Sequence, residues 1–68
     1  MNIILEYKGY TASVEYDEED NIYFGKVIGI SDLISFHGES ITDVKKNFKE
    51  SIECYLEFCK EVGKIPEK

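Results

Sequence analysis

The residues best placed for chemistry are four consecutive acids, Asp17, Glu18, Glu19 and Asp20, which are followed by Asn21. Carboxylate and amide oxygens are the ligands that calcium and magnesium prefer, so a divalent cation is one interpretation of this run. The run lacks the spaced acids and the glycine of an EF-hand loop. A solvated turn and an electrostatic contact with a basic protein are the other interpretations. Among the functional ones, the contact with a basic partner is favoured over metal binding.

Three further reactive side chains are the single histidine, His37, and two cysteines, Cys54 and Cys59. Catalysis by His37 would need a nucleophile or carboxylate held against it, and its neighbours Ser35 and Glu39 do not establish such a pair. The cysteines are about 140° apart around a helix, so they cannot form a disulfide without unwinding it. With no Cys-x-x-Cys, a zinc site lacks ligands. We therefore predict no catalytic, cofactor-binding or metal-binding residue, and interpret the cysteines as small apolar residues in a reducing compartment.

The element with the strongest signals is a helix over residues 40–63. Ser40 and Asp43 resemble a capping box at its start, and Gly63 with the following Pro66 marks its end. The helix would be about 33 Å long. Its outer face carries lysines and glutamates and reads as a solvated surface. Its inner face is an apolar stripe with spacings of three and four, made of Ile41, Val44, Phe48, Ile52, Tyr55, Leu56 and Cys59.

The residues before the helix read as strands. Residues 10–16 alternate between Tyr10, Ala12, Val14 and Tyr16 on one side and polar residues on the other. The acidic run is then the tip of a hairpin that leads into a second strand, residues 22–28, with Tyr23, Gly25 and Val27 facing inward. A third strand covers residues 33–38, with Ile34 and Phe36 inward and His37 outward. Residues 3–7 either extend the first strand or form a preceding one, with Gly9 as a bulge or bend.

These elements predict a single α+β domain over residues 1–68, a three-stranded antiparallel meander covered by one long C-terminal helix. A core of this size often supplies only about 3–5 kcal/mol. The sheet also leaves edges and one face open, so we expect homo-oligomers that associate through a strand edge or through exposed apolar residues such as Tyr23 or Phe24, and Phe58.

The charge of the chain limits its partners. Its formal net charge is −6 and all eight basic residues are lysines. This argues against direct DNA or RNA binding, which uses basic patches and usually arginine. No apolar run approaches the roughly 20 residues that span a membrane, and the first residues lack the basic start of a signal peptide. We expect a cytoplasmic protein with a basic protein partner.

The order of several short motifs resembles one family. The motifs are YKGYTASVEYD at residues 7–17, YFGKV at 23–27, FHGES at 36–40, then Phe48 and YLEFC at 55–59 before a glycine and a proline. No single motif is specific, but in this order they resemble the N-terminal domain of the HicB family of antitoxins over nearly the whole chain.

The resemblance implies a partial RNase H-like fold and a type II toxin–antitoxin system. The implied partner is a HicA-like toxin, a small basic ribonuclease that cleaves mRNA and that the antitoxin binds and neutralises. The antitoxin itself would not be an enzyme and would need no cofactor. HicB antitoxins usually continue into another strand and a DNA-binding segment, whereas these residues stop at Lys68.

Two other functions remain open. The first is a stand-alone oligomeric domain of the same fold that binds a protein or a small ligand without a toxin partner. The second is a metal-dependent nuclease, which distant relatives of the fold would suggest. A small basic protein encoded by the neighbouring gene would separate the antitoxin from both, because neither alternative requires one.

Overall fold

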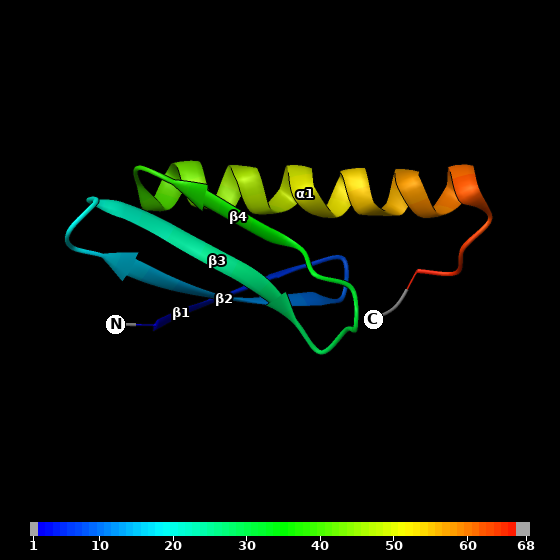
Figure 1. Ribbon diagram of the computed structural model, residues 1–68, viewed down its shortest axis with the longest axis horizontal. Coiled ribbons are helices and arrows are strands. Elements are labelled where there is room, and N and C mark those ends of the chain that lie inside the picture. The colour runs from blue at the N-terminus through cyan, green and yellow to red at the C-terminus, as the bar shows by residue number, and fades with distance from the viewer. Residues whose placement is uncertain (1, 67–68) are drawn as a thin grey trace.

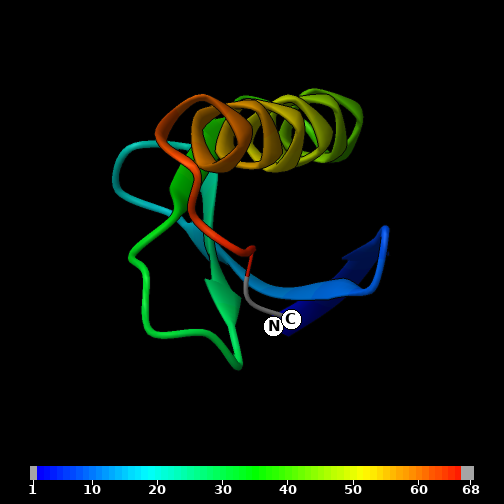
Figure 2. The ribbon, with the colours of Figure 1, turned by 90° about the vertical axis from the view of Figure 1, so that its right-hand side faces the viewer.

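The computed structural model describes residues 2–66, so the prediction of a domain over residues 1–68 includes Met1, Glu67 and Lys68, which lie outside the described residues. Four strands come first in the chain, β1 (Asn2–Tyr7), β2 (Tyr10–Asp17), β3 (Ile22–Ile28) and β4 (Ser35–Gly38). One helix follows, α1 (Ile41–Val62), and it lies lengthwise across one face of the sheet (Figure 1), which is also seen when the helix is viewed end-on (Figure 2). The strands pair in the order β1-β2-β3-β4, and every pair is antiparallel.

The α+β fold with one long helix against an antiparallel sheet was predicted correctly, but the number of strands was not. The sheet has four strands, because β1 is separate and pairs with β2 from Asn2 opposite Glu15 to Tyr7 opposite Tyr10. Lys8 and Gly9 form the connection, with φ of 51° and 84°. Two consecutive residues at positive φ make the tight hairpin turn that matches the twist of antiparallel strands. Gly9 is therefore a turn residue rather than a bulge.

The predicted strand phases hold over most of the sheet. Tyr10, Ala12 and Val14 are buried beneath the helix, as are Val27 and Phe36. Tyr16 is the exception, because its side chain remains 40 % exposed and packs at the end of β2 against Tyr23, with ring centroids 4.8 Å apart.

The glycine in β3 makes room for the core. A Cβ on Gly25 would come within 2.8 Å of both Phe36 Cζ and Val14 Cγ2. The Phe36 ring therefore occupies the space that a side chain at position 25 would fill. It reaches the helix there, with its centroid 5.2 Å from that of Phe48.

Both ends of the helix follow the sequence signals. The Ser40 hydroxyl accepts a hydrogen bond from the Asp43 N–H at 3.1 Å, and Gly63 ends the helix at φ 73°. The five buried helix residues, Val44, Phe48, Ile52, Tyr55 and Cys59, all belong to the predicted stripe. Within the described residues, no helix is long and apolar enough to cross a membrane.

Candidate functional site

The acidic run lies at the hairpin between β2 and β3, as predicted. Asp17 ends β2, and Glu18, Glu19 and Asp20 lie in the turn, which projects from one end of the molecule (Figure 1). The turn is organised by its own side chains. Asp17 Oδ1 accepts a hydrogen bond from the Glu19 N–H at 3.0 Å, and the Tyr16 hydroxyl donates one to Asn21 Oδ1 at 3.1 Å. Glu18, Glu19 and Asp20 are exposed, whereas Asp17 is half-buried. The three exposed carboxylates therefore face solvent, where they can act on a partner at long range.

The acidic turn does not gather the ligands of a metal site. Among residues 2–66, no group of three or more His, Cys, Asp or Glu side chains is arranged to hold a metal ion. Asp17 Oδ1 already accepts a hydrogen bond from the Glu19 N–H, so this oxygen serves the turn itself.

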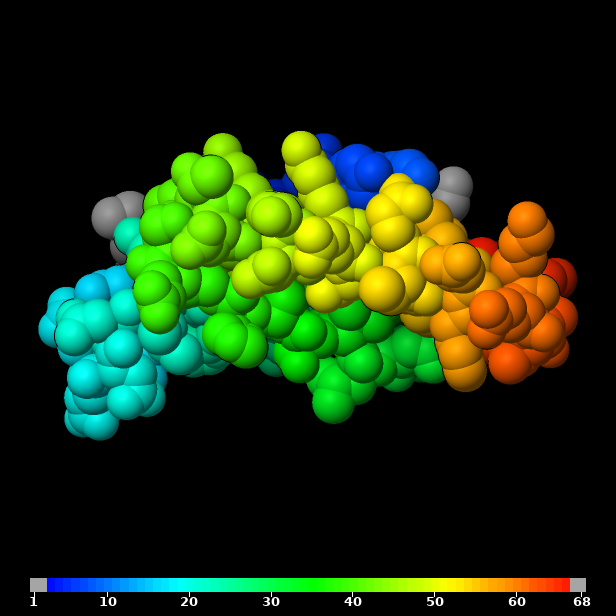
Figure 3. Space-filling view, turned by 90° about the horizontal axis from the view of Figure 1, so that it is seen from above, coloured from blue at the N-terminus to red at the C-terminus, as the bar shows by residue number. Residues whose placement is uncertain are grey.

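A groove runs between the outer edge of β4 and one flank of α1. Its volume is about 750 Å³, and β4 and the residue before it, Ile34, form one wall while the helix forms the other. Figure 3, viewed from the helix side, shows the β4 side of the molecule along one flank of the helix and β1 along the other. The helix side chains that line the groove are Asn47, Glu50, Ser51, Cys54, Tyr55 and Phe58.

The groove is more apolar than the solvated surface that the sequence suggested. Leu33 at one end of its strand wall is 88 % exposed, and Phe58 on the helix wall is 55 % exposed. Phe36 belongs to the strand wall and is buried. Exposed apolar side chains gathered in a groove mark an interaction site more often than isolated ones do.

One wall of the groove is the free edge of a strand. The Val27 N–H donates to the Ile34 carbonyl at 2.9 Å, which sets the hydrogen-bonding phase between β3 and β4. Residues bond to the neighbouring strand in alternation, so Ser35 and His37 fall in the non-bonded pairs opposite Lys26 and Phe24. Their backbone N–H and C=O groups therefore point away from β3. The side chain of Asn47 donates to the His37 carbonyl at 2.5 Å, which agrees with this direction.

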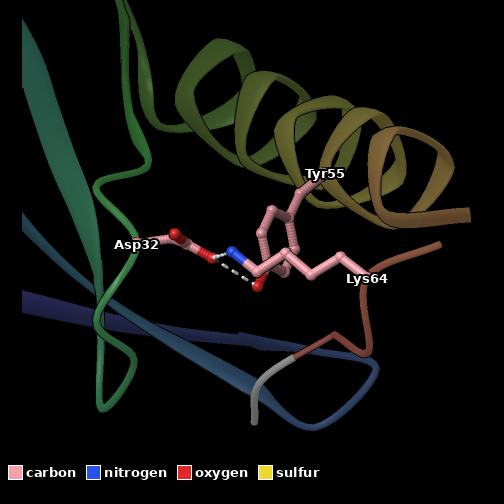
Figure 4. Close-up of polar contacts among 3 residues, drawn as sticks. All are labelled: Asp32, Tyr55 and Lys64. Atoms are coloured by element: carbon pink, nitrogen blue, oxygen red, sulfur yellow. Dashed lines mark hydrogen bonds and ion pairs between the residues drawn. The ribbon is translucent and has the colours of Figure 1, made fainter. Parts of the chain in front are cut away.

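The loop between β3 and β4 is attached to the helix by a cluster of three polar side chains (Figure 4). Asp32 Oδ2 accepts hydrogen bonds from the Tyr55 hydroxyl at 2.8 Å and from Lys64 Nζ at 2.5 Å. Asp32 is the residue before Leu33, so the cluster attaches the backbone next to the groove-lining Leu33 to the helix. This cluster could not be predicted from the sequence, because Asp32 is 23 residues from Tyr55 and 32 from Lys64 and the three carry no local signal.

The opposite flank of the helix contacts the turn between β1 and β2. Glu53 accepts a hydrogen bond from the Tyr7 hydroxyl at 2.8 Å and forms an ion pair with Lys8. Hydrogen bonds from Lys8 and then Tyr7 hold the pKa of the Glu53 carboxyl below its usual value. The hydrogen bond to Glu53 also raises the pKa of Lys8 and the pKa of Tyr7. The three groups fix the hairpin turn onto the helix.

Two of the other sequence candidates, His37 and Cys54, line the groove, and Phe24 is the strand partner of His37. His37 is exposed on β4 and lines the groove, and Phe24 is exposed on the sheet face away from the helix, both in the predicted phase. Tyr23 is half-buried on the opposite face. Cys54 is exposed in the groove, whereas Cys59 is buried, and neither forms a disulfide. The structure does not bring His37 and a cysteine into a hydrogen-bonded pair among the described residues.

Comparisons with known proteins add no relative. No family model matches the chain, and neither a curated protein nor a solved structure matches it.

Proposed function

We propose that this chain is a HicB-like antitoxin domain, a partial RNase H-like fold that binds and neutralises a small basic HicA-like ribonuclease. The observation that carries the proposal is the place in the fold of the motif residues that resemble the HicB family. In FHGES, Phe36 enters the core, Gly38 lies against the first helical turn and Ser40 caps the helix. In YFGKV, Gly25 leaves space for the Phe36 ring. The motifs thus describe one connected junction between the sheet and the helix.

The surface of the domain suits such a partner. The net charge of −6 favours encounter with a basic protein, and three exposed carboxylates project at the turn between β2 and β3. The groove beside β4 supplies exposed apolar side chains for close contact. In this proposal the acids accelerate association and the groove side chains hold the complex, so the toxin is inhibited by being covered rather than by any reaction.

The proposal is tested by co-expression with a small basic protein, which we expect the neighbouring gene to encode. The pair should co-purify, and the chain should relieve the growth arrest that the basic protein causes. If the two proteins do not co-purify and this chain does not restore growth, the antitoxin function is wrong.

The role of the acidic turn is tested separately by association kinetics. The variant Glu18→Gln/Glu19→Gln should associate more slowly with the toxin at low salt, and the difference should shrink as salt screens the charges. The matched control Glu6→Gln/Glu15→Gln also removes two charges, but from exposed positions on β1 and β2 outside the turn. If both double variants associate at the same rate, the acidic turn does not accelerate association with the toxin.

A second function is favoured by the uncovered face of the sheet. Ile4, Phe24 and Ile28 are large apolar residues exposed on the strands, and β1 and β4 both present an edge. These features suit a stand-alone oligomeric binding domain. Two results together would favour the antitoxin over this second function. Light scattering would find only monomer at micromolar concentration, and a basic protein encoded by the neighbouring gene would co-purify.

A further inference from the structure

The charged residues of the helix are sorted onto two flanks. Asp43, Glu50, Glu57 and Glu61 follow one another at spacings of seven, seven and four residues, and this places them on one side of a helix. Asn47 and Cys54 fall in the same repeat and line the groove, as Glu50 itself does. These four acids therefore form an acidic stripe beside the groove, and Glu50 is the one of them that lines it.

Three of the four lysines of the helix lie toward the other flank. Lys49 Nζ lies 5.8 Å from the centroid of the Tyr7 ring on β1, and Lys45 and Lys60 share its side of the helix by their spacing. Glu53, on this flank, is neutralised by its ion pair with Lys8. Among the side chains that line the groove, none is a lysine. Among the helix side chains that line the groove, Glu50 is thus the only charged one, and Lys46, one turn before it, is the helix lysine nearest to it.

The strand wall of the groove offers the backbone groups that an added strand requires. The N–H groups of Ser35 and His37 and the C=O of Ser35 point outward, by the phase that the Val27–Ile34 hydrogen bond sets. The apolar side chains of Leu33 and Phe58 lie on either side of this edge. A strand of four residues gives an added segment about 13 Å of pairing.

We infer that the β4–α1 groove binds an extended, lysine- or arginine-rich segment of a partner protein, which adds as a strand to the edge of β4. Its backbone pairs with Ser35 and His37, its apolar side chains pack on Leu33 and Phe58, and its cations lie along the acidic stripe that includes Glu50. This inference rests on the proposed role in binding a basic protein, and it names the surface and the form of the ligand.

Charge decides between this occupant and a second copy of the chain. Two copies paired edge to edge would bring two acidic stripes together on chains that each carry a net charge of −6. Like charges brought together across an interface are destabilising. A basic segment reverses the sign of that interaction.

The binding test uses the full chain and a fluorescein-labelled peptide of alternating lysine and valine, read by fluorescence anisotropy. The wild-type chain should bind this peptide and should not bind a peptide of alternating glutamate and valine. Glu50→Lys/Glu57→Lys should weaken binding by at least about tenfold. The matched control Glu6→Lys/Glu15→Lys changes the net charge equally at exposed positions outside the groove, and should weaken binding by less. Equal losses in the two double variants would overturn the inference.

Strand addition is tested at Ser35. Because the Ser35 N–H points away from β3, Ser35→Pro removes an edge donor without removing a β3–β4 hydrogen bond, and should weaken binding by about tenfold or more. Ser35→Ala keeps the donor and should bind like the wild type. Circular dichroism shows whether Ser35→Pro is folded. If it is not folded, the protection of Cys54 described next decides the question in the wild-type chain.

Cys54 is a built-in reporter, because it is exposed in the groove while Cys59 is buried. Saturating peptide should slow the reaction of Cys54 with a maleimide by about tenfold. Peptide binding with no change in this rate would place the peptide elsewhere and overturn the inference, as would a dimer that protects Cys54 without peptide.

The same reporter separates this inference from the antitoxin function. If the toxin co-purifies and Cys54 stays fully reactive in the complex, the groove proposal fails and the antitoxin function stands. If the peptide protects Cys54 but no neighbouring basic protein is neutralised, the groove stands and the antitoxin function fails.

Discussion

The substitution Gly38→Ala tests how closely the end of β4 approaches the helix. A Cβ built on Gly38 would lie 2.5 Å from the Val44 N and 2.9 Å from the Asp43 carbonyl carbon. Both are backbone atoms of the first turn of α1, and they cannot rotate away as a side chain would. Alanine at this position must therefore push the start of the helix away from β4, and Val44 would lose part of its packing in the core.

The expected cost combines two opposing effects. Forcing extra atoms into a packed site costs about 1–3 kcal/mol. Replacing glycine by alanine also restricts the unfolded chain, which returns about 0.4–1 kcal/mol when the folded conformation suits alanine. Because the obstructing atoms are backbone, we expect a net loss of about 2 kcal/mol. A domain of this size often has a core worth only about 3–5 kcal/mol, so the variant would lose roughly half of its stability.

Urea unfolding followed by far-ultraviolet circular dichroism measures this loss. With a slope near 1 kcal/mol per molar urea, the midpoint should fall by about 2 M. Gly25→Ala is the matched control, because the nearest atoms to its new Cβ belong to the side chains of Phe36 and Val14 and can shift. It should lose less than Gly38→Ala. A midpoint for Gly38→Ala equal to that of the wild type, or a larger loss for Gly25→Ala, would refute the reasoning.

Three further predictions concern the helix and its attachments. Ser40→Ala removes the oxygen that caps the Asp43 N–H and should cost about 1 kcal/mol in urea unfolding. The pKa of Glu53 is lowered from 4.5 in the folded state, so its contacts stabilise the fold above that pH and are lost as the pH falls through the lower value. The difference in urea midpoint between wild type and Glu53→Gln should accordingly narrow between about pH 7 and about pH 3. Asp32→Asn weakens the contacts with Tyr55 and Lys64, and should speed amide hydrogen exchange in the β3–β4 loop while leaving exchange in β2 unchanged.

The helix and the strand phases could be predicted because their signals are local. Ser40, Gly63 and the repeat of apolar residues act within one or a few turns of the helix. The separate first strand was harder to predict, because Lys8 adopts a positive φ that is uncommon for a residue other than glycine, asparagine or aspartate. Gly9 alone is compatible with both a bulge and a turn. The pairing of β1 with β2, which brings Tyr7 opposite Tyr10, makes Gly9 part of a turn.

The groove could not be derived from the chain alone. The sequence shows that the outer residues of the helix are charged, but the difference between its two flanks depends on which strand lies beside each. Glu50 and Glu53 illustrate this dependence, since they are three residues apart. One lines the groove beside β4 and the other binds the turn before β2.

The division of the core between the sheet and the helix has a consequence for how the protein is made. Among residues 2–66, five of the ten buried hydrophobic residues, Val44, Phe48, Ile52, Tyr55 and Cys59, belong to the helix, which follows all four strands. The strands pair in the order of synthesis, so the sheet can form while translation continues. Until the helix leaves the ribosome, however, the nascent sheet has nothing to cover Tyr10, Ala12 and Val14. During that interval the nascent chain is most exposed to aggregation and to chaperones.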